Sequence, residues 1–166
     1  AEQTGDVSLQ VRCLTYLGVV HRRQGRDAEA EPIARRGLGM AEAAGMLAYI
    51  GANRAGLAWV AWRRNDLSAA ERLAQAALDA WRLQAMPYPF YWQALWPLIG
   101  VAVAQDRMAD AVAYARRLYE PDQQVLPSEL EALLTSVAGA WDSGRPDEAR
   151  DFLNRALALA QKSNLS

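Results

Sequence analysis

The sequence predicts an all-α fold in which about four antiparallel helix hairpins stack side by side as a solenoid. One pattern of residues recurs four times, at intervals of 38 to 41 positions. Apolar residues within and before each copy recur at the spacing of a helix, and the alternation typical of strands is absent. These observations predict a single domain over residues 1–166, with hairpins at approximately 6–45, 46–85, 88–120 and 128–164.

The second helix of each hairpin begins in one of four similar segments: GRDAEAEPIARRGL, NDLSAAERLAQAAL, DRMADAVAYARRLY and GRPDEARDFLNRAL. Their first residues tolerate a left-handed backbone, so each predicts a tight turn between two helices. These turn residues are Gly25, Asn65, Asp106 and Gly144. Five residues later each segment carries an alanine (Ala30, Ala70, Ala111 and Ala149), and such small residues let neighbouring helices approach closely.

An amphipathic segment precedes each turn and forms the first helix of the hairpin. The third, MPYPFYWQALWPLIGVAVAQ at 86–105, contains no charged residue. Its prolines (Pro87, Pro89 and Pro97) and Gln93 argue against a membrane span, so we expect a helix covered by units two and four. Pro97 removes one backbone hydrogen bond from this helix and predicts a kink there.

Two further signals mark helix starts in unit four. Ser128 is followed three residues later by Glu131, which predicts a capping box. Pro146 occupies a position where the first turn of a helix tolerates proline.

The repeat resembles the tetratricopeptide repeat. Residues of the first two units match that family's signature: Leu14, Leu17, Gly18, Ala30 and Ala34, then Leu57, Ala70, Ala74 and Ala77. The period is near 40, longer than the family's 34, and the signature aromatics are mostly missing. The resemblance implies a right-handed superhelix, a TPR-like α-solenoid. Long, degenerate repeats of this kind are similar to those at the C-terminal end of bacterial signalling ATPases, including relatives of the maltose regulator and ATPases fused to nucleotide-cyclase domains.

The beginning of the chain resembles the end of a repeat. AEQTG at 1–5 recurs as AEAAG at 41–45, so we expect residues 1–5 to close a preceding hairpin of a longer protein. The first unit then presents Leu14, Leu17 and Val20 on an uncovered face. Such exposed repeat ends predict self-association.

Charge and cysteine content narrow the partners and the compartment. The formal net charge of −1 favours neither nucleic acid nor an anionic membrane as a partner. The single cysteine, Cys13, excludes an internal disulfide, and no secretory signal opens the chain. We therefore expect a cytoplasmic protein.

No catalytic or cofactor-binding pattern is apparent. His21 and Cys13 supply only two candidate ligands, too few for a zinc site, and neither a P-loop nor a dinucleotide-binding loop occurs. The sequence therefore predicts a non-enzymatic module without a metal or cofactor. Its partner is a protein, a peptide or a small effector, within a larger bacterial signalling or regulatory protein. The alternative is a structural spacer or oligomerisation array without a groove ligand.

The resemblance also implies which residues line the groove of the solenoid. Carrying the family's groove positions onto this sequence selects four tryptophans and two arginines: Trp59, Trp62, Trp96, Trp141, Arg22 and Arg63. Aromatic and arginine side chains are frequent anchors of binding surfaces. Tryptophans between helices also serve simply as core, and both interpretations remain open at this point.

Overall fold

A computed structural model describes residues 2–162 of the chain, with side chains from Val7 onward. Within that range the chain forms eight α-helices and no strand, which confirms the all-α fold. The helices are α1 (Glu2–Arg23), α2 (Asp27–Ala43), α3 (Leu47–Arg63), α4 (Leu67–Arg82), α5 (Trp92–Ala104), α6 (Met108–Arg117), α7 (Ser128–Asp142) and α8 (Pro146–Lys162).

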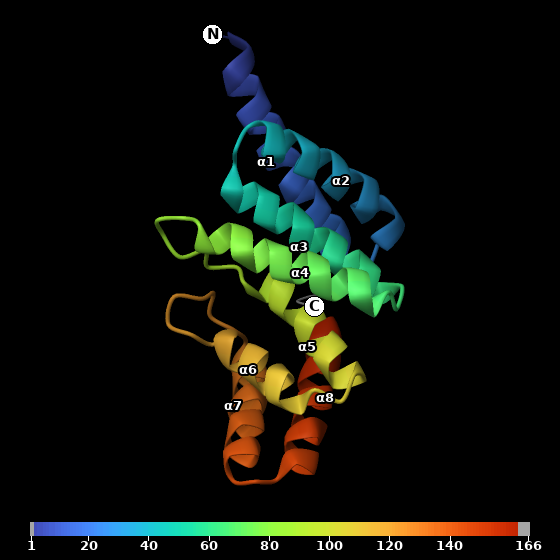
Figure 1. The fold of residues 1–166 in the computed structure, drawn as a ribbon, viewed down its shortest axis with the longest axis vertical. Helices are drawn as coiled ribbons and strands as arrows, with labels where there is room; N and C mark the ends of the chain where they lie inside the picture. The colour runs from blue at the N-terminus through green and yellow to red at the C-terminus, as the bar shows by residue number, and fades with distance from the viewer. Residues whose placement is uncertain (1, 163–166) are drawn as a thin grey trace.

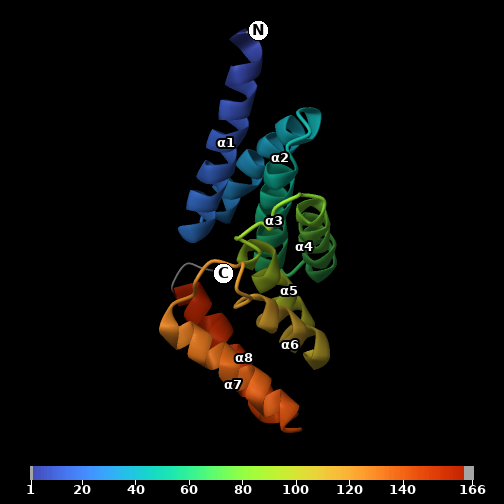
Figure 2. The ribbon, with the colours of Figure 1, turned by 90° about the vertical axis from the view of Figure 1, so that its left-hand side faces the viewer.

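Consecutive helices pair into four hairpins, and the first three hairpins stack in order (Figure 1). The second helix of one hairpin packs on the first helix of the next, so α2 lies on α3 and α4 lies on α5. The first helices also pack on one another, α1 on α3 and α3 on α5. The start of α1 projects beyond α2 in both views (Figures 1 and 2).

The four predicted turn residues all adopt the left-handed backbone conformation. The φ angles are +68° at Gly25, +60° at Asn65, +60° at Asp106 and +70° at Gly144. In every turn the amide of the next residue donates to the carbonyl five residues earlier: Arg26 to His21, Asp66 to Ala61, Arg107 to Ala102 and Arg145 to Ala140. This is the hydrogen bond that ends a helix on a left-handed residue. The turn prediction is confirmed.

The predicted helix starts of unit four had different outcomes. Pro146 is the first residue of α8, as expected. The capping box at Ser128 was wrong, because Pro127 occupies the N-cap and no side chain caps α7. The carbonyl of Pro127 accepts from the amides of Leu130 and Glu131, both at 3.0 Å.

Residues 2–5 do not end a helix, contrary to the expectation that residues 1–5 close a preceding hairpin. α1 runs without interruption from Glu2 to Arg23, whereas Gly45 in the similar sequence AEAAG has a φ of +65° and ends a helix. Sequence similarity at this point therefore does not reproduce the turn.

α5 is the uncharged segment of the sequence, and every residue from Trp92 to Ala102 is buried. The helix begins only at Trp92, since the backbone before a proline avoids the helical region and Pro87 and Pro89 precede it. No helix in the described part of the chain is long and apolar enough to span a membrane. The helix is not broken at Pro97. The kink stays a prediction.

The fourth hairpin departs from the regular stack. α7 packs on α6 but does not lie on α5 as α5 lies on α3, and α8 contacts α5 instead. In Figure 1 the α7–α8 hairpin runs steeply across the direction of α3 and α4. The connection 118–127 precedes this change of direction.

Hydrophobic residues form one large core and two smaller clusters. The large core extends from Ala52 in α3 to Ala160 in α8. The smaller clusters join the first hairpin to the array: Val11 and Ala41 meet α3 and α4, and Ala30 packs against α3. The four repeated alanines are all buried.

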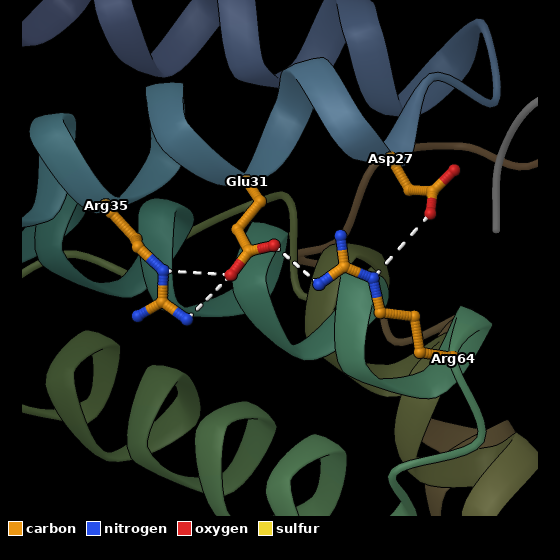
Figure 3. Close-up of polar contacts among 4 residues, drawn as sticks. All are labelled: Asp27, Glu31, Arg35 and Arg64. Carbon is orange, nitrogen blue, oxygen red and sulfur yellow. Dashed lines mark hydrogen bonds and ion pairs between the residues drawn. The ribbon is translucent and has the colours of Figure 1, made fainter.

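Ion pairs on the surface join neighbouring hairpins (Figure 3). Glu31 of α2 accepts from Arg35 and from Arg64, and Arg64 also lies 3.8 Å from Asp27. Hydrogen bonds from Arg35 and Arg64 hold the pKa of the Glu31 carboxyl below its usual range. Such exposed pairs contribute at most about 1 kcal/mol each to the free energy of unfolding, so they add little to the stability of the array.

Candidate ligand pocket

A pocket of about 260 Å³ lies between α1, α3 and the segment that leads into α5. Five aromatic side chains line it: Tyr16, Tyr49, Tyr88, Phe90 and Trp92. Its polar lining consists of Thr15, Arg23, Gln93 and Gln124. We call this the aromatic pocket. It combines rigid apolar surfaces with a few polar groups, as ligand sites commonly do.

Trp81 of α4 supports the floor of the aromatic pocket from behind. Its ring stacks on Tyr88 with centroids 4.4 Å apart and an interplanar angle of 17°. The indole nitrogen donates to the carbonyl of Ala48 at 3.0 Å, and the ring lies directly over Gly51. Phe90 meets Tyr88 edge to face at 5.5 Å. These contacts hold the Tyr88 ring in place.

The 118–127 connection fixes the other side of the aromatic pocket. Gln123 donates to the carbonyl of Tyr88 at 3.2 Å and accepts from the amide of Tyr91 at 3.0 Å. The side-chain oxygen of Gln124 accepts from the Trp92 indole at 3.0 Å. These side-chain hydrogen bonds therefore hold the 118–127 connection and the segment before α5 in a defined conformation.

Burial raises the pKa values of two phenols in the aromatic pocket, those of Tyr88 and Tyr49. Desolvation, followed by the nearby phenol of Tyr16, raises the pKa of Tyr88 well above its usual value. The same two causes, in the same order, raise the pKa of Tyr49. At neutral pH both phenols are uncharged.

Arg22 lies buried beside the aromatic pocket, with 3% of its surface exposed. Its guanidinium carbon lies 5.8 Å from the centre of the Trp59 ring and 5.2 Å from that of Trp92. Its Nη1 donates to the carbonyl of Gln93 at 2.7 Å. A helix bonds that carbonyl to the amide four residues on, which is Pro97, and proline has no N–H to donate. Arg22 therefore replaces the hydrogen bond that Pro97 removes.

Burial, and then repulsion from Arg23, lowers the pKa of Arg22 to about 9. Its Nε and Nη2 have no hydrogen-bond partner among the described residues. Among the described residues, no carboxylate therefore neutralises this charge by direct contact.

None of the six residues predicted from the resemblance lines the aromatic pocket. Trp59 and Trp96 are core residues, with 2% and 0% of their surface exposed. Trp62 is partly buried, and its ring lies against Gly100 of α5. Trp141 packs on the large core from α7. That any of these tryptophans binds a ligand stays a prediction.

The structure does bring three of the six together. Trp59 has Arg22 near its ring and also Arg63, whose guanidinium carbon lies 5.9 Å from the ring centre. Trp96 lines a second cavity of about 320 Å³, which it shares with Arg23 and Trp92. Of the predicted residues, Arg22, Trp59 and Trp96 thus lie near Trp92 or Arg23 of the aromatic pocket.

Sequence analysis missed the tyrosines and Phe90 of the aromatic pocket. Tyr16 and Tyr49 stand on first helices, and an aromatic residue on each of two first helices was a usable signal. Tyr88 and Phe90 were attributed to a buried helix, although they precede α5. In the part of the chain that the structure describes, no group of three His, Cys, Asp or Glu residues could hold a metal ion.

Comparison with known families supports the repeat architecture. Tetratricopeptide-repeat models match residues 11–44 and 56–125, which together make up more than half of the chain. The second match ends within the connection that precedes the fourth hairpin. No curated protein and no solved structure gave a match to the chain.

Proposed function

Because the chain carries tetratricopeptide repeats, which generally mediate protein–protein interaction, we propose that it binds a peptide segment of a protein partner in the aromatic pocket. In this proposal the chain is a non-catalytic module of a larger bacterial signalling or regulatory protein in the cytoplasm. The long period of the repeats supports that setting.

The observation that carries the proposal is the aromatic pocket itself. Its rings come from three separate parts of the chain, and hydrogen bonds and stacking hold them before any ligand arrives. Ordered aromatic side chains bury a large area on binding and lose little conformational entropy. The space accommodates one or two peptide side chains, so the rest of a bound segment lies along α1 and α3.

Peptide selection on the folded protein tests this proposal. Phe90→Ala removes a pocket ring that is 37% exposed, so the fold survives. Met86→Ala is the matched control, since Met86 belongs to the same connection but is 76% exposed and does not line the pocket. We expect peptides selected on the wild type to bind Phe90→Ala at least about tenfold more weakly, because interface anchors contribute about 2 kcal/mol or more.

Binding measured by fluorescence anisotropy separates the outcomes. Peptides that bind Met86→Ala and the wild type equally, and Phe90→Ala weakly, support the proposal. Peptides that bind Phe90→Ala as tightly as the wild type contradict the proposal. A selection that returns no binding peptide also contradicts it. Thermal melts of both variants establish that each is folded.

A second candidate, an oligomerisation array, is favoured by the outer face of α1. Leu17 is 45% exposed, whereas Leu57 and Leu98, its counterparts one and two repeats later, are 6% and 1% exposed. The same holds for Val20 at 45% against its counterparts Val60 at 3% and Val101 at 0%. In α3 and α5 the preceding hairpin covers these positions.

Analytical ultracentrifugation tests this second candidate. We expect concentration-dependent self-association of the wild type that Leu17→Glu abolishes. Leu83→Glu is the control, because Leu83 is exposed elsewhere on the surface. A monomeric wild type at every concentration rules out this candidate.

A further inference from the structure

The second cavity adjoins the aromatic pocket and extends the site beyond it. Arg23, Trp92 and Gln124 line both spaces, so the two share a wall. The second cavity, of about 320 Å³, continues along residues 125–127, which belong to no helix. Val125 is 87% exposed, and Phe90 of the aromatic pocket is 37% exposed, so both spaces open at the surface. One bound segment can therefore occupy both.

The polar side chains of the second cavity offer hydrogen-bond donors. Trp96 lines it, and the indole Nε1 of this residue is buried without a hydrogen-bond partner among the described residues. The side-chain oxygen of Gln124 accepts from Trp92, which leaves the Gln124 amide nitrogen as a donor without a partner in the described part of the chain. An unpaired buried donor costs free energy, so an occupant that supplies acceptors is favoured.

These donors decide which backbone conformation suits the site. A helical peptide uses its carbonyls within its own helix. An extended strand brings an N–H group with every carbonyl, and each of those needs an acceptor of its own. A polyproline II segment leaves its carbonyls unbonded, and proline carries no N–H. A proline-rich segment therefore supplies acceptors and adds few donors.

The rings of the site suit proline as well. Proline-rich segments bind in grooves lined by aromatic side chains, and they are ordered before they bind. Tyr88 is held in place by its stacking on Trp81 and by the hydrogen bond from Gln123 to its carbonyl. When site and segment are both ordered beforehand, binding costs little conformational entropy.

We propose that the aromatic pocket and the second cavity together bind a proline-rich segment of the partner in the polyproline II conformation. One proline ring packs in the aromatic pocket against Phe90. A second proline, three residues away on the same edge of the segment, enters the second cavity beside Val125. Carbonyls of the segment accept from the Gln124 amide and the Trp96 indole. This inference rests on the proposed function, and it names the sequence class and conformation of the partner.

Peptides selected from a random library on the folded protein test the inference. We expect the selected peptides to share two prolines three residues apart. Replacing both prolines by alanine should weaken binding at least about tenfold, because it removes two anchors and the preformed conformation of the segment. Selected peptides that lack proline, or that bind as tightly after the replacement, overturn the inference.

Two variants assign the prolines to the cavities. Phe90→Ala alters the aromatic pocket and Val125→Ala the second cavity, while Leu83→Ala is the matched control, exposed and lining neither. We expect replacement of one proline to weaken binding to the wild type much more than to Phe90→Ala. Replacement of the other should show the same relation to Val125→Ala, since groups in contact are coupled. If neither proline is coupled to Val125, the second cavity is not part of the site and the inference is wrong.

Gln124→Glu tests the hydrogen bonds to the segment. The carboxylate still accepts from the Trp92 indole, but it has no N–H to donate. We expect the proline-rich peptide to bind this variant about fivefold more weakly, the effect of one lost hydrogen bond. Gln10→Glu is the matched control, because it adds the same charge at an exposed position of α1 that lines neither cavity. Equal binding to Gln124→Glu and to the wild type contradicts the proposed carbonyl contact.

The outcomes separate this inference from the function on which it rests. If selected peptides depend on Phe90 but need no proline, the peptide-binding function stands and the proline-rich class is wrong. If no peptide binds in a manner that depends on Phe90, both proposals fail.

Discussion

Gly100 of α5 lets the Trp62 ring of α3 lie directly against the α5 backbone, and replacing it tests how the first helices pack. A Cβ atom at this position lies 2.3 Å from two ring atoms of Trp62, far inside van der Waals contact. Gly100→Ala therefore forces the indole away from α5. Overpacking of this kind costs about 1–3 kcal/mol. We expect the variant to lose that much unfolding free energy, or about 2–12 °C in melting temperature, since 1 kcal/mol corresponds to roughly 2–4 °C at this chain length.

A matched glycine and a second substitution isolate the cause. Gly39 lies within α2, and nothing lies within 4 Å of a Cβ atom there. Gly39→Ala should therefore stabilise by about 0.5–1 kcal/mol, the ordinary gain of alanine over glycine in a helix. Trp62→Ala opens space beside Gly100. In that background Gly100→Ala should change from destabilising to neutral or mildly stabilising.

Urea unfolding followed by circular dichroism gives the four free energies of the double-mutant cycle. We expect Trp62 and Gly100 to be coupled by about 1–3 kcal/mol, the range for residues in direct contact. If Gly100→Ala costs the same with and without the indole, the contact does not limit the approach of α5 to α3, and the reasoning is refuted.

Three further predictions follow from the pocket and its surroundings. Gly51→Ala should destabilise the fold more than Gly100→Ala does, because the Trp81 ring that lies against Gly51 is 1% exposed and hydrogen-bonded. Equal melting temperatures of the two variants would contradict this. The raised pKa of Tyr88 stabilises the fold below the unfolded-state value of 10.0, and this contribution is lost as the pH rises above it. Urea titrations from pH about 10 to about 12 should therefore show a shallower fall for Tyr88→Phe than for wild type, and parallel curves would be the contrary result. Finally, Arg22→Met should cost about 1–3 kcal/mol less in a Pro97→Ala background, where the restored amide pairs the carbonyl that Arg22 serves; an unchanged cost would show that this carbonyl is not what Arg22 stabilises.

The repeat architecture was readable from the sequence because its determinants are local. A left-handed turn needs one residue that tolerates positive φ. Asn65 and Asp106 indicated their turns as clearly as Gly25 and Gly144 did. A close helix pair needs a small residue at a fixed distance from that turn, and Ala70 and Ala111 supply it. Such requirements repeat from unit to unit, so each copy supports the interpretation of the others.

The aromatic pocket depends on contacts that no local pattern reveals. Tyr88 and Phe90 line it because Pro87 and Pro89 delay the start of α5, and because Gln123 bonds back to this segment across 32 to 35 residues. Tyr88 and Phe90 lie outside any helix, so the positions that the family pattern assigns along a helix cannot be applied to them. The groove positions taken from the family pattern therefore fell on residues that do not line the pocket.

The division of the core has a consequence for how the array opens. The first hairpin is joined to the rest by two small apolar clusters, while a single large core holds α3 to α8 together. In native-state hydrogen exchange, regions with fewer buried apolar contacts open at lower free energy. The amides of α1 and α2 should therefore exchange ahead of those in α5. Since α1 supplies Tyr16 and Arg23 to the aromatic pocket, this opening dismantles the pocket without unfolding the molecule. A ligand that bridges α1 and α3 thus protects the first hairpin by mass action, and its affinity can be read from the exchange rates alone.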